Sequence, residues 1–369
     1  MLTLILGRAG TGKTERMMEE ICRRVREGRR NLFYIVPEQY SHEAERQLLR
    51  RCGDKLNLHG EVLSFSRLTH RCLAQTGGLA RTQVSAGGRM LLMSCALRDV
   101  AGRLKVYSGA ARRPEYLELL VETVSQMKRA CVTPLDLEAA ARHVQPPLRD
   151  KLEDLALIAA AYDARLTEDM IDPDDLPAEL AAAVRRCSLF EDARVYIDGF
   201  TDFTPAELQV VREMMRLDLD MAVCLTCDGL DGTEEPFETA RRTARLLIRE
   251  AEKLGVKSRI IMETENRREG PEELKFLERN LFSYQTARFE GAAGALELWR
   301  GKTPAEECEY AAARVLQLVR AGARWRDIAV AAGDWGAYGA LLESTFEKYG
   351  IPTYTSRKTD LREKPPVAL

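Results

Sequence analysis

Short apolar runs alternate with amphipathic stretches over the first part of the chain. The apolar runs, residues 2–6, 31–36 and 61–65, have the length of buried strands, and residues 13–27 and 43–52 between them predict helices. Strands that alternate with helices form βαβ units with parallel strands. The opening of the chain therefore predicts an α/β fold around a parallel sheet.

The block from about residue 79 to residue 186 is rich in Ala, Leu and Arg and is typical of helices. One buried helix face is indicated by residues spaced three or four apart: Tyr116, Leu120, Val124 and Met127. Thr133, Pro134 and Asp136 predict the start of another helix. We interpret the block as a helical insertion within the α/β domain.

Strands return after this block. Residues 193–197 and 221–226 are again buried apolar runs. Between them, Thr204 and Glu207 form a capping box, with Pro205 at the first helical position. The α/β pattern thus resumes where the helical block ends.

A further unit is expected after the polar stretch of residues 263–273. Its predicted strands are residues 296–299, 327–331 and 351–354, and its predicted helices are residues 304–321 and 338–349. So few strands cannot bury a sheet of their own. We therefore expect the chain, which stops at Pro365–Leu369, to be the N-terminal part of a larger polypeptide.

Composition indicates a globular protein with more than one core, since 45% of the 369 residues are hydrophobic and 30% are charged. No apolar run has the length of a membrane-spanning helix, so we expect no membrane association. The net charge of −2 conceals a split: residues 1–160 carry 26 Lys/Arg against 18 Asp/Glu, and residues 161–240 carry 6 against 20. A polyanion is expected to meet the first part more readily.

Nine cysteines are dispersed along the chain, which predicts free thiols in a reducing cytoplasm. Cys224 and Cys227 form the only C-x-x-C pair. No second pair accompanies them, so alternating positions on a buried strand explain them better than a zinc site.

Residues 7–14 match the phosphate-binding pattern G-x-x-x-x-G-K-[ST]. They are Gly7, Arg8, Ala9, Gly10, Thr11, Gly12, Lys13 and Thr14. In this motif backbone N–H groups surround the phosphates, the lysine reaches the outer phosphates and the Thr14 hydroxyl ligates Mg²⁺. The motif lies between a predicted strand and a predicted helix, as it must, so we expect nucleotide binding. The alternative is a glycine-rich turn with a solvated lysine.

Asp198 ends the strand at residues 193–197 and is a candidate for the acidic residue that helps hold Mg²⁺. The alternative is an ordinary strand-terminal or capping aspartate. Active nucleic-acid motors that have this phosphate-binding pattern carry Glu immediately after this Asp, where it positions the attacking water. Here that residue is Gly199. Glycine can neither orient nor deprotonate water, so we expect binding without fast hydrolysis. Gly199→Glu is the corresponding gain-of-function substitution.

Five segments together resemble superfamily 1 helicase motifs, and in these forms they look like the B subunit of the bacterial AddAB helicase–nuclease. The segments are residues 7–14, Phe33–Gln39, Val62–Arg67, Tyr196–Pro205 and Trp325–Val330. The Pro-Glu-Gln and Asp-Gly-Phe-Thr-Asp-Phe variants are more specific than the phosphate-binding loop alone. The resemblance covers essentially the whole chain.

Three domains are then expected. They are a RecA-like P-loop domain (1–78 plus 187–290), a helical insertion (79–186) and the beginning of a second RecA-like domain (291–369).

The resemblance also implies a function. It implies a subunit that binds ATP and Mg²⁺, contacts single- or double-stranded DNA, and forms a heterodimer with a motor (A) subunit during recombinational repair of double-strand breaks. Recognition of a hotspot sequence and a C-terminal nuclease with an iron–sulfur cluster are implied as well. The cluster ligands would lie beyond residue 369, so no catalytic residue is assigned.

The sequence differs from that of active helicase motors at several motifs. Only six residues precede Gly7, where motors have an adenine-reading glutamine segment, and no glutamine follows residues 221–226. Leu298-Trp-Arg-Gly lacks the Asn-Tyr-Arg-Ser pattern. These features predict a helicase-like subunit that does not drive unwinding. The alternatives are an active superfamily 1 helicase or other P-loop phosphotransferase, and a structural DNA clamp that keeps the loop as a relic.

Candidate DNA contacts follow from the same resemblance. They are Pro37, Gln39, Ser64, Phe65 and Arg67. An aromatic ring such as Phe65 could stack on a base, and Arg67 could meet a phosphate. The alternative for Phe65 is a core position at a strand end.

Overall fold

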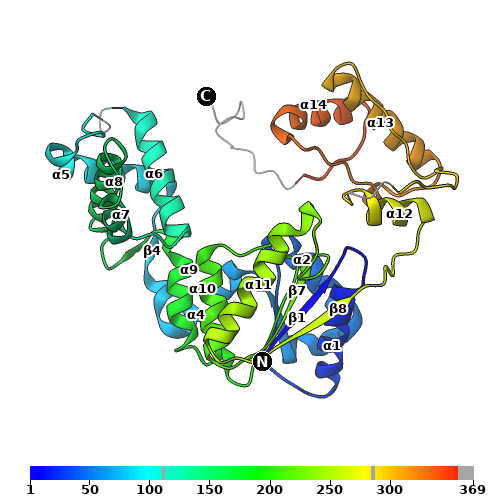
Figure 1. Ribbon diagram of the computed structural model, residues 1–369, viewed down its shortest axis with the longest axis horizontal. Coiled ribbons are helices and arrows are strands. Elements are labelled where there is room, and N and C mark those ends of the chain that lie inside the picture. Colours follow the sequence, from blue (N-terminus) through cyan, green and yellow to red (C-terminus); the bar gives the residue numbers. More distant parts are fainter. Residues whose placement is uncertain (110–112, 284–286, 356–369) are drawn as a thin grey trace. The chain divides into compact units, whose positions relative to one another are not determined.

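The computed structural model describes residues 1–109, 113–283 and 287–355 (Figure 1). Its largest element is a six-stranded sheet in the order β3-β2-β6-β7-β1-β8, in which all neighbouring strands are parallel. The strands are β1 (Leu2–Gly7), β2 (Leu32–Ile35), β3 (Gly60–Leu63), β6 (Arg194–Ile197), β7 (Asp220–Thr226) and β8 (Ser258–Glu263). The predicted α/β fold with a parallel sheet is confirmed.

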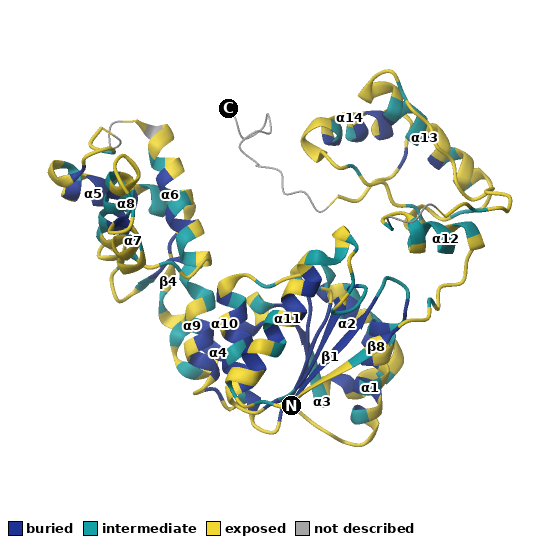
Figure 2. Ribbon diagram, in the orientation of Figure 1, coloured by how far each residue is buried: buried dark blue, intermediate teal, exposed yellow. Residues whose placement is uncertain are grey.

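Helices cover both faces of the sheet, and the inner strands are buried between them (Figure 2). Along β1, Leu4 and Leu6 enter one core and Ile5 enters the other, because successive side chains of a strand point to opposite faces. The first core is covered by α4 (Phe65–Thr76), α9 (Leu176–Val184), α10 (Pro205–Arg216) and α11 (Glu238–Lys253). The second is covered by α1 (Lys13–Arg26), α2 (Glu38–Cys52) and α3 (Leu56–His59).

Three helices between β3 and β6 share a core of their own: α5 (Ala86–Val100), α6 (Pro114–Arg129) and α8 (Leu148–Asp163). A fourth helix, α7 (Pro134–Ala141), packs against α8. On α6, Leu120 and Val124 are buried as the spacing predicts, and Met127 is partly buried, but Tyr116 is 39% exposed. The Thr133 side chain accepts a hydrogen bond from the Asp136 backbone at the start of α7, which confirms the helix start predicted there.

Two very short strands accompany this block. β4 (Thr82–Gln83) pairs in parallel with β5 (Met170–Ile171), and the four helices lie between them in the sequence. Single 3₁₀ turns are also present among the described residues: Gly53–Lys55, Gly78–Ala80, Ala101–Arg103, Pro173–Asp175, Ser188–Phe190, Glu235–Phe237 and Trp325–Asp327.

The chain divides into two units, residues 1–269 with 281–285 and residues 270–280 with 286–369. The second unit contains α12 (Glu272–Asn280), α13 (Pro304–Arg320) and α14 (Trp335–Lys348). Its small core is formed by Cys308, Ala312, Val315, Leu342, Phe346 and Ile351. Residues 356–369, the last part of the domain expected at 291–369, lie outside the described residues.

The strands predicted for the second unit are wrong. Residues 296–299, 327–331 and 351–354 form no strand, although the helices flanking them are present. A strand needs a hydrogen-bonded neighbour, and none of the described segments of this unit provides one. Trp299 instead stacks on Tyr310 of α13, with ring centroids 4.1 Å apart.

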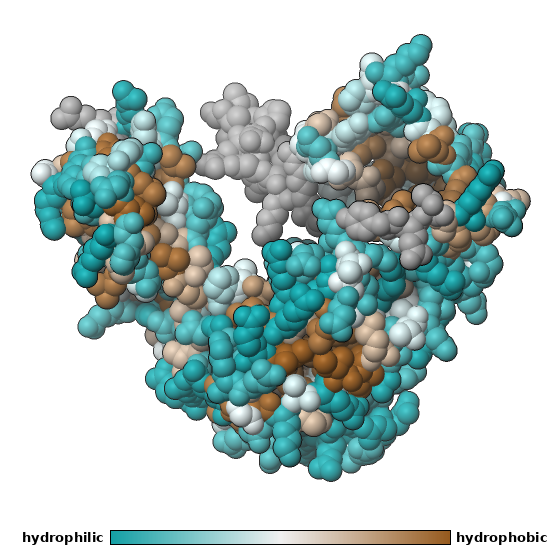
Figure 3. All heavy atoms as spheres, in the orientation of Figure 1, coloured by the Kyte–Doolittle hydropathy of each residue, from teal (hydrophilic) through white to brown (hydrophobic). Residues whose placement is uncertain are grey.

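The edge strand β8 was not predicted. It begins with Ser258 and Arg259, and it pairs on one side only, with β1. Ile260 and Met262 remain 44% and 41% exposed. Figure 3 shows hydrophobic surface over β1 and β8. A half-exposed edge strand lacks the continuous apolar run that identifies the inner strands.

The expectation of free thiols is wrong for two of the nine cysteines. Cys22 of α1 and Cys52 of α2 form a disulfide, whereas Cys224 is buried on β7 and Cys227 immediately follows it. Among the described residues, no helix is long and apolar enough to cross a membrane.

Candidate nucleotide-binding site

The carboxyl ends of the six parallel strands meet at one edge of the sheet, which is where such folds bind ligands. The P-loop, residues 7–14, connects β1 to α1 at this edge. Pro37 follows β2, Ser64 follows β3 and Asp198 follows β6. The sheet therefore assembles residues that are far apart in the sequence.

The backbone of the P-loop requires glycine at two positions. Gly10 and Gly12 have φ angles of 81° and 87°, in the left-handed region that disfavours other residues. Gly7 has a different reason to be glycine, because an added Cβ would lie 2.6 Å from the Thr11 hydroxyl. The loop can therefore turn tightly enough to present its backbone N–H groups to an anion.

Lys13 is the first residue of α1 and only 7% exposed. Its amine donates a hydrogen bond to the Arg8 carbonyl at 2.7 Å, and no ion pair links it to a carboxylate of the described residues. Burial lowers the pKa of this amine below its usual 10.5, while nearby Cys224 and Asp198 act in the opposite direction. The amine is thus a buried cation without a dedicated counter-ion, which suits it to a phosphate.

A cavity of about 530 Å³ opens in front of the loop. It is lined by Ala9, Gly10, Gly12, Lys13, Thr14, Glu15, Met18, Gln47, Asp198, Gly199, Thr226, Arg267 and Arg268. Lys13 and Thr14 of the P-loop and Asp198, which is far from them in the sequence, line this one cavity.

Asp198 is buried, with 6% of its surface exposed. One carboxylate oxygen accepts a hydrogen bond from the Tyr34 hydroxyl at 3.0 Å, and the other accepts one from the Gly199 backbone at 2.8 Å. Burial, together with the Asp198 charge, raises the pKa of Tyr34 well above its usual value, so Tyr34 remains a donor. These bonds fix the orientation of the carboxylate toward the cavity that it lines.

Gly199 has a φ of 82°, and an added Cβ would lie 3.0 Å from the Pro37 ring. An L side chain is therefore strained at this position. Gly199→Glu is thus unsuitable as a simple gain-of-function substitution, because it changes the backbone as well as the chemistry.

Two lining residues, Arg267 and Arg268, were missed from the sequence. They follow β8, and the Arg267 backbone donates a hydrogen bond to the Gly10 carbonyl at 2.8 Å. Glu263, at the end of β8, holds this segment through ion pairs with Arg16 at 2.6 Å and Arg267 at 3.2 Å. The two adjacent arginines were the available signal, but the edge strand β8 that precedes them was not predicted.

The larger cavity of about 1170 Å³ lies at the opposite, amino edge of the sheet. Arg194 is buried there and paired with Glu20 at 2.9 Å and with Asp220. Its charge is already matched, so we place the candidate site in the smaller cavity at the P-loop.

The predicted DNA contacts lie at the carboxyl edge in two groups. Pro37 precedes the first turn of α2, in which Gln39 is exposed. Ser64 is buried and caps α4 by accepting a hydrogen bond from the Arg67 backbone at 3.2 Å. The Arg67 side chain is half-exposed and lies 3.8 Å from Glu45.

Phe65 starts α4, so the expectation that it ends a strand is wrong. Its ring packs edge-on against Phe200 at 5.5 Å and Phe203 at 6.3 Å, which makes it part of an aromatic cluster. The cluster packs on the sheet core while remaining partly exposed. Both a packing role and a stacking surface are compatible with this position.

Residues 4–278 match the family described as ADDB, N-terminal. Relatives named as the B subunit of an ATP-dependent helicase/deoxyribonuclease come from Thermoanaerobacter sp. (strain X514), Acetivibrio thermocellus and Clostridium perfringens (strain 13 / Type A), with identities of 32%, 31% and 29%. The alignments cover 99%, 100% and 99% of this chain but 33%, 33% and 32% of the relatives. The chain thus spans about a third of their length. Because the family match includes most of its residues, the chain belongs to the ADDB N-terminal family.

Proposed function

We propose that this chain is the ATP-binding, helicase-like N-terminal part of the B subunit of a helicase–nuclease, and that it contacts DNA without driving unwinding. The observation that carries the proposal is the buried amine of Lys13, which forms no ion pair with a described carboxylate and lines one cavity with Thr14 and Asp198. A buried cation of this kind is stabilised by an anion that enters the cavity. The names of the relatives support the assignment to a helicase–nuclease.

The donor set fits a nucleotide with Mg²⁺. Thr14 offers a hydroxyl and Asp198 a carboxylate, and Mg²⁺ in such sites is held by few protein oxygens together with phosphates and water. When bound, the ion would neutralise phosphate charge. Lys13 and the backbone of the P-loop hold the phosphates, and Arg267 and Arg268, which line the same cavity, add positive charge.

Weak hydrolysis is proposed because of Gly199. No side chain at this position can orient a water molecule, and the loop after β7 lacks the glutamine that senses the outer phosphate. An active superfamily 1 helicase or another P-loop phosphotransferase remains the competing function, and a DNA clamp with a relic loop is the third.

DNA and a motor (A) subunit in a heterodimer are the proposed partners, in the cytoplasm, with recombinational repair of double-strand breaks as the process. The relatives are named as one subunit of an enzyme, which supports a complex. Among the described residues, no group of three or more His, Cys, Asp or Glu side chains could hold a metal ion. The iron–sulfur cluster of the family therefore enters no step proposed for these residues.

The proposed domains are a RecA-like P-loop domain (1–78 plus 187–290), a helical insertion (79–186) and the start of a second RecA-like domain (291–369). The second unit supports the last of these. Its helices leave an apolar groove of about 590 Å³, lined by Trp325, Trp335 and Phe346 among others, where a sheet could pack.

Nucleotide titration tests the proposal. A fluorescent ATP analogue should bind the chain, and Lys13→Ala should weaken binding by about tenfold or more, because a hydrogen bond to a charged group contributes about 1.5–3 kcal/mol. Lys105→Ala is the matched control, since Lys105 is exposed and paired with Asp150.

Turnover separates the three functions. We expect negligible ATP hydrolysis with or without single-stranded DNA. Strong DNA-stimulated hydrolysis would favour the active motor, and absence of nucleotide binding by the unaltered chain would favour the clamp.

A further inference from the structure

The side chain of Arg8, the second residue of the P-loop, binds the loop that follows β7. Its Nη1 atom lies 2.7 Å from a carboxylate oxygen of Glu234, and its guanidinium carbon lies 5.0 Å from the centre of the Phe237 ring. The Arg8 and Glu234 side chains are only 21% and 16% exposed. A sheltered charge pair is screened less by salt than a surface pair. This contact is therefore a firm link between two loops that lie 226 residues apart.

The segment that contains Glu234 and Phe237, which we call loop 227–237, is also held by contacts of Cys227 and Asp228. The Cys227 backbone donates a hydrogen bond to the Gly7 carbonyl at 3.1 Å. The Asp228 carboxylate accepts one from the Glu234 backbone at 3.2 Å and pairs with Arg241 at 2.6 Å. Arg241 is buried in α11, so the loop connects the P-loop to the first turns of that helix.

The backbone of Arg8 takes part in the phosphate site. Its carbonyl accepts hydrogen bonds from the Lys13 amine at 2.7 Å and from the Thr11 hydroxyl at 3.0 Å. A phosphate would compete for the same amine, and a bond between two charged groups is stronger than one to a neutral carbonyl. Phosphate binding would thus take the Lys13 amine away from the carbonyl of Arg8, the residue whose side chain holds Glu234.

We propose that Arg8 is a positioning residue that couples occupancy of the phosphate site to loop 227–237 and the start of α11. The inference rests on the proposed nucleotide binding and adds an element that responds to it, loop 227–237. It places that element after β7, where the sequence has no glutamine sensor. Arg8 joins the two because its carbonyl contacts Lys13 and its side chain contacts Glu234 and Phe237.

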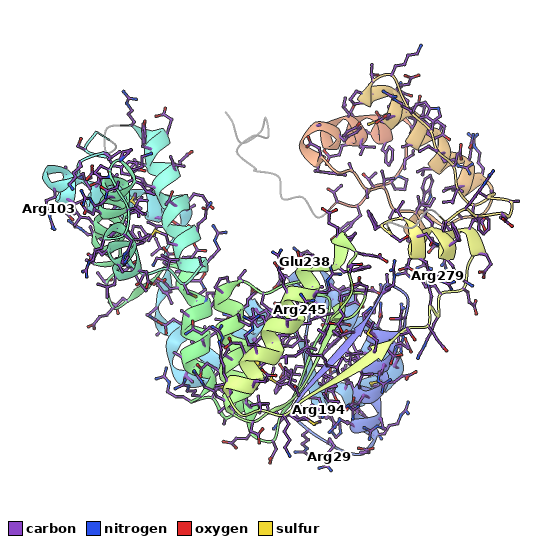
Figure 4. All side chains as sticks on the ribbon, viewed as in Figure 1. Arg29, Arg103, Arg194, Glu238, Arg245 and Arg279 are labelled. Atoms are coloured by element: carbon purple, nitrogen blue, oxygen red, sulfur yellow. A yellow bond between two sulfur atoms is a disulfide. The ribbon has the colours of Figure 1, made fainter. Side chains whose placement is uncertain are left out.

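Hydrogen exchange of the 369-residue chain, with and without a saturating non-hydrolysable ATP analogue, tests this coupling. The variants are Arg8→Ala and the isosteric Glu234→Gln, which removes the charge without leaving a cavity. Arg245→Ala is the matched control, because Arg245 donates to the Leu230 carbonyl of the same loop, and no hydrogen bond or ion pair among the described residues joins it to the P-loop. Figure 4 labels Arg245 on α11, together with Glu238 at the start of the helix.

We expect the analogue to change exchange in loop 227–237 of the unaltered chain, and we expect this change to be lost in Arg8→Ala and Glu234→Gln. Arg245→Ala should raise exchange in the loop in both states and keep the difference between them. If Arg8 had only a structural role, Arg8→Ala would loosen loop 227–237, but the analogue would still change hydrogen exchange in that loop.

Fluorescence titration of the same samples separates the two proposals. Analogue binding without any change in loop 227–237, or an equal change in Glu234→Gln, overturns the coupling and leaves nucleotide binding intact. No binding by the unaltered chain overturns the proposed function, and the coupling with it.

Discussion

The amine of Lys13 is both buried and placed in the phosphate cavity, and its protonation links these properties. Below its folded-state pKa the amine is charged and attracts a phosphate, and above it the amine is neutral. Because burial lowers this pKa below 10.5, the charged form is lost at a lower pH than in an ordinary lysine. In the unfolded chain the pKa is higher, so between the two values stability rises with pH while affinity for the anion falls.

Nucleotide affinity should therefore decline with increasing pH before an exposed lysine would begin to deprotonate. Titrations between about pH 7 and pH 10 measure this decline. Lys13→Arg is the control, because a guanidinium keeps its charge throughout this range. A constant affinity in the unaltered chain, or the same decline in Lys13→Arg, would contradict the assignment to Lys13.

Gly199 gives a second prediction about a single residue. Gly199→Ala should lower the free energy of unfolding by about 1–2 kcal/mol, because its φ lies in the left-handed region, with a further cost from the Pro37 ring at 3.0 Å. Gly28→Ala is the matched control, since Gly28 has a φ of 75° and no heavy atom within 4 Å of an added Cβ.

Urea denaturation of both variants separates the backbone cost from the contact with Pro37. Equal losses would mean that the Pro37 contact has no effect. Gly199→Glu should be destabilised in the same way and should gain no hydrolysis, contrary to the interpretation from the sequence.

Residues could be predicted where one chemical role fixes their identity. Gly10, Gly12 and Lys13 are such residues, because a loop around phosphates needs left-handed backbone and a cation. Arg267 and Arg268 could not be predicted, because they reach the P-loop only through the pairing of β1 with β8. The contact between Arg8 and Glu234 depends on a similar pairing, that of β1 with β7.

At the scale of elements, α1 and α2 are joined by two different links. The Cys22–Cys52 disulfide is one, and an ion pair between Glu15 and Arg51 is the other. Glu15 lies in the first turn of α1, directly after the P-loop. The two helices that follow β1 and β2 are thus held together beside the candidate site.

Reduction of this disulfide should lower the free energy of unfolding by about 2–4 kcal/mol, because the bridge restricts the unfolded chain. Thermal unfolding with and without a thiol reductant measures the effect, and Cys52→Ser should abolish the difference. A melting temperature that does not respond to reductant in the unaltered chain would indicate that the two thiols are free.

Elements were predictable where burial on both faces gives a continuous apolar run, as in β1, β2, β6 and β7. The segment at 328–331 is similarly apolar but has no partner strand among the described residues, and the segment at 351–354 also lacks one. Local pattern predicts the tendency to form a strand, and pairing decides whether the strand forms. The same reasoning explains why the edge strand β8 was missed.

At the scale of the whole chain, part of the charge split predicted from the sequence is neutralised by internal ion pairs. Arg89 in the basic part binds Asp174 at 2.7 Å, and Lys128 binds Asp175 at 2.6 Å. Arg8 and Glu234 form a third pair of this kind. The basic surplus of residues 1–160 is therefore weaker evidence for a polyanion partner than the sequence suggests.

The parallel pairing of β4 with β5 has a consequence for the modularity of the chain. Thr82 faces Met170 and Gln83 faces Ile171, so the segment between them leaves and returns at adjacent strands, about 4.8 Å apart. Three helices with a core of their own, α5, α6 and α8, lie in that interval together with α7, which packs on α8. The block is thus an excisable module with neighbouring ends.

Replacing residues 84–169 with a short Gly/Ser linker should leave Lys13-dependent nucleotide binding intact, which the same fluorescence titration would measure. Loss of binding would show that the helices support the P-loop. If binding survives, the block and the phosphate site can change independently during evolution, so related proteins could carry different helical modules on an unchanged nucleotide site.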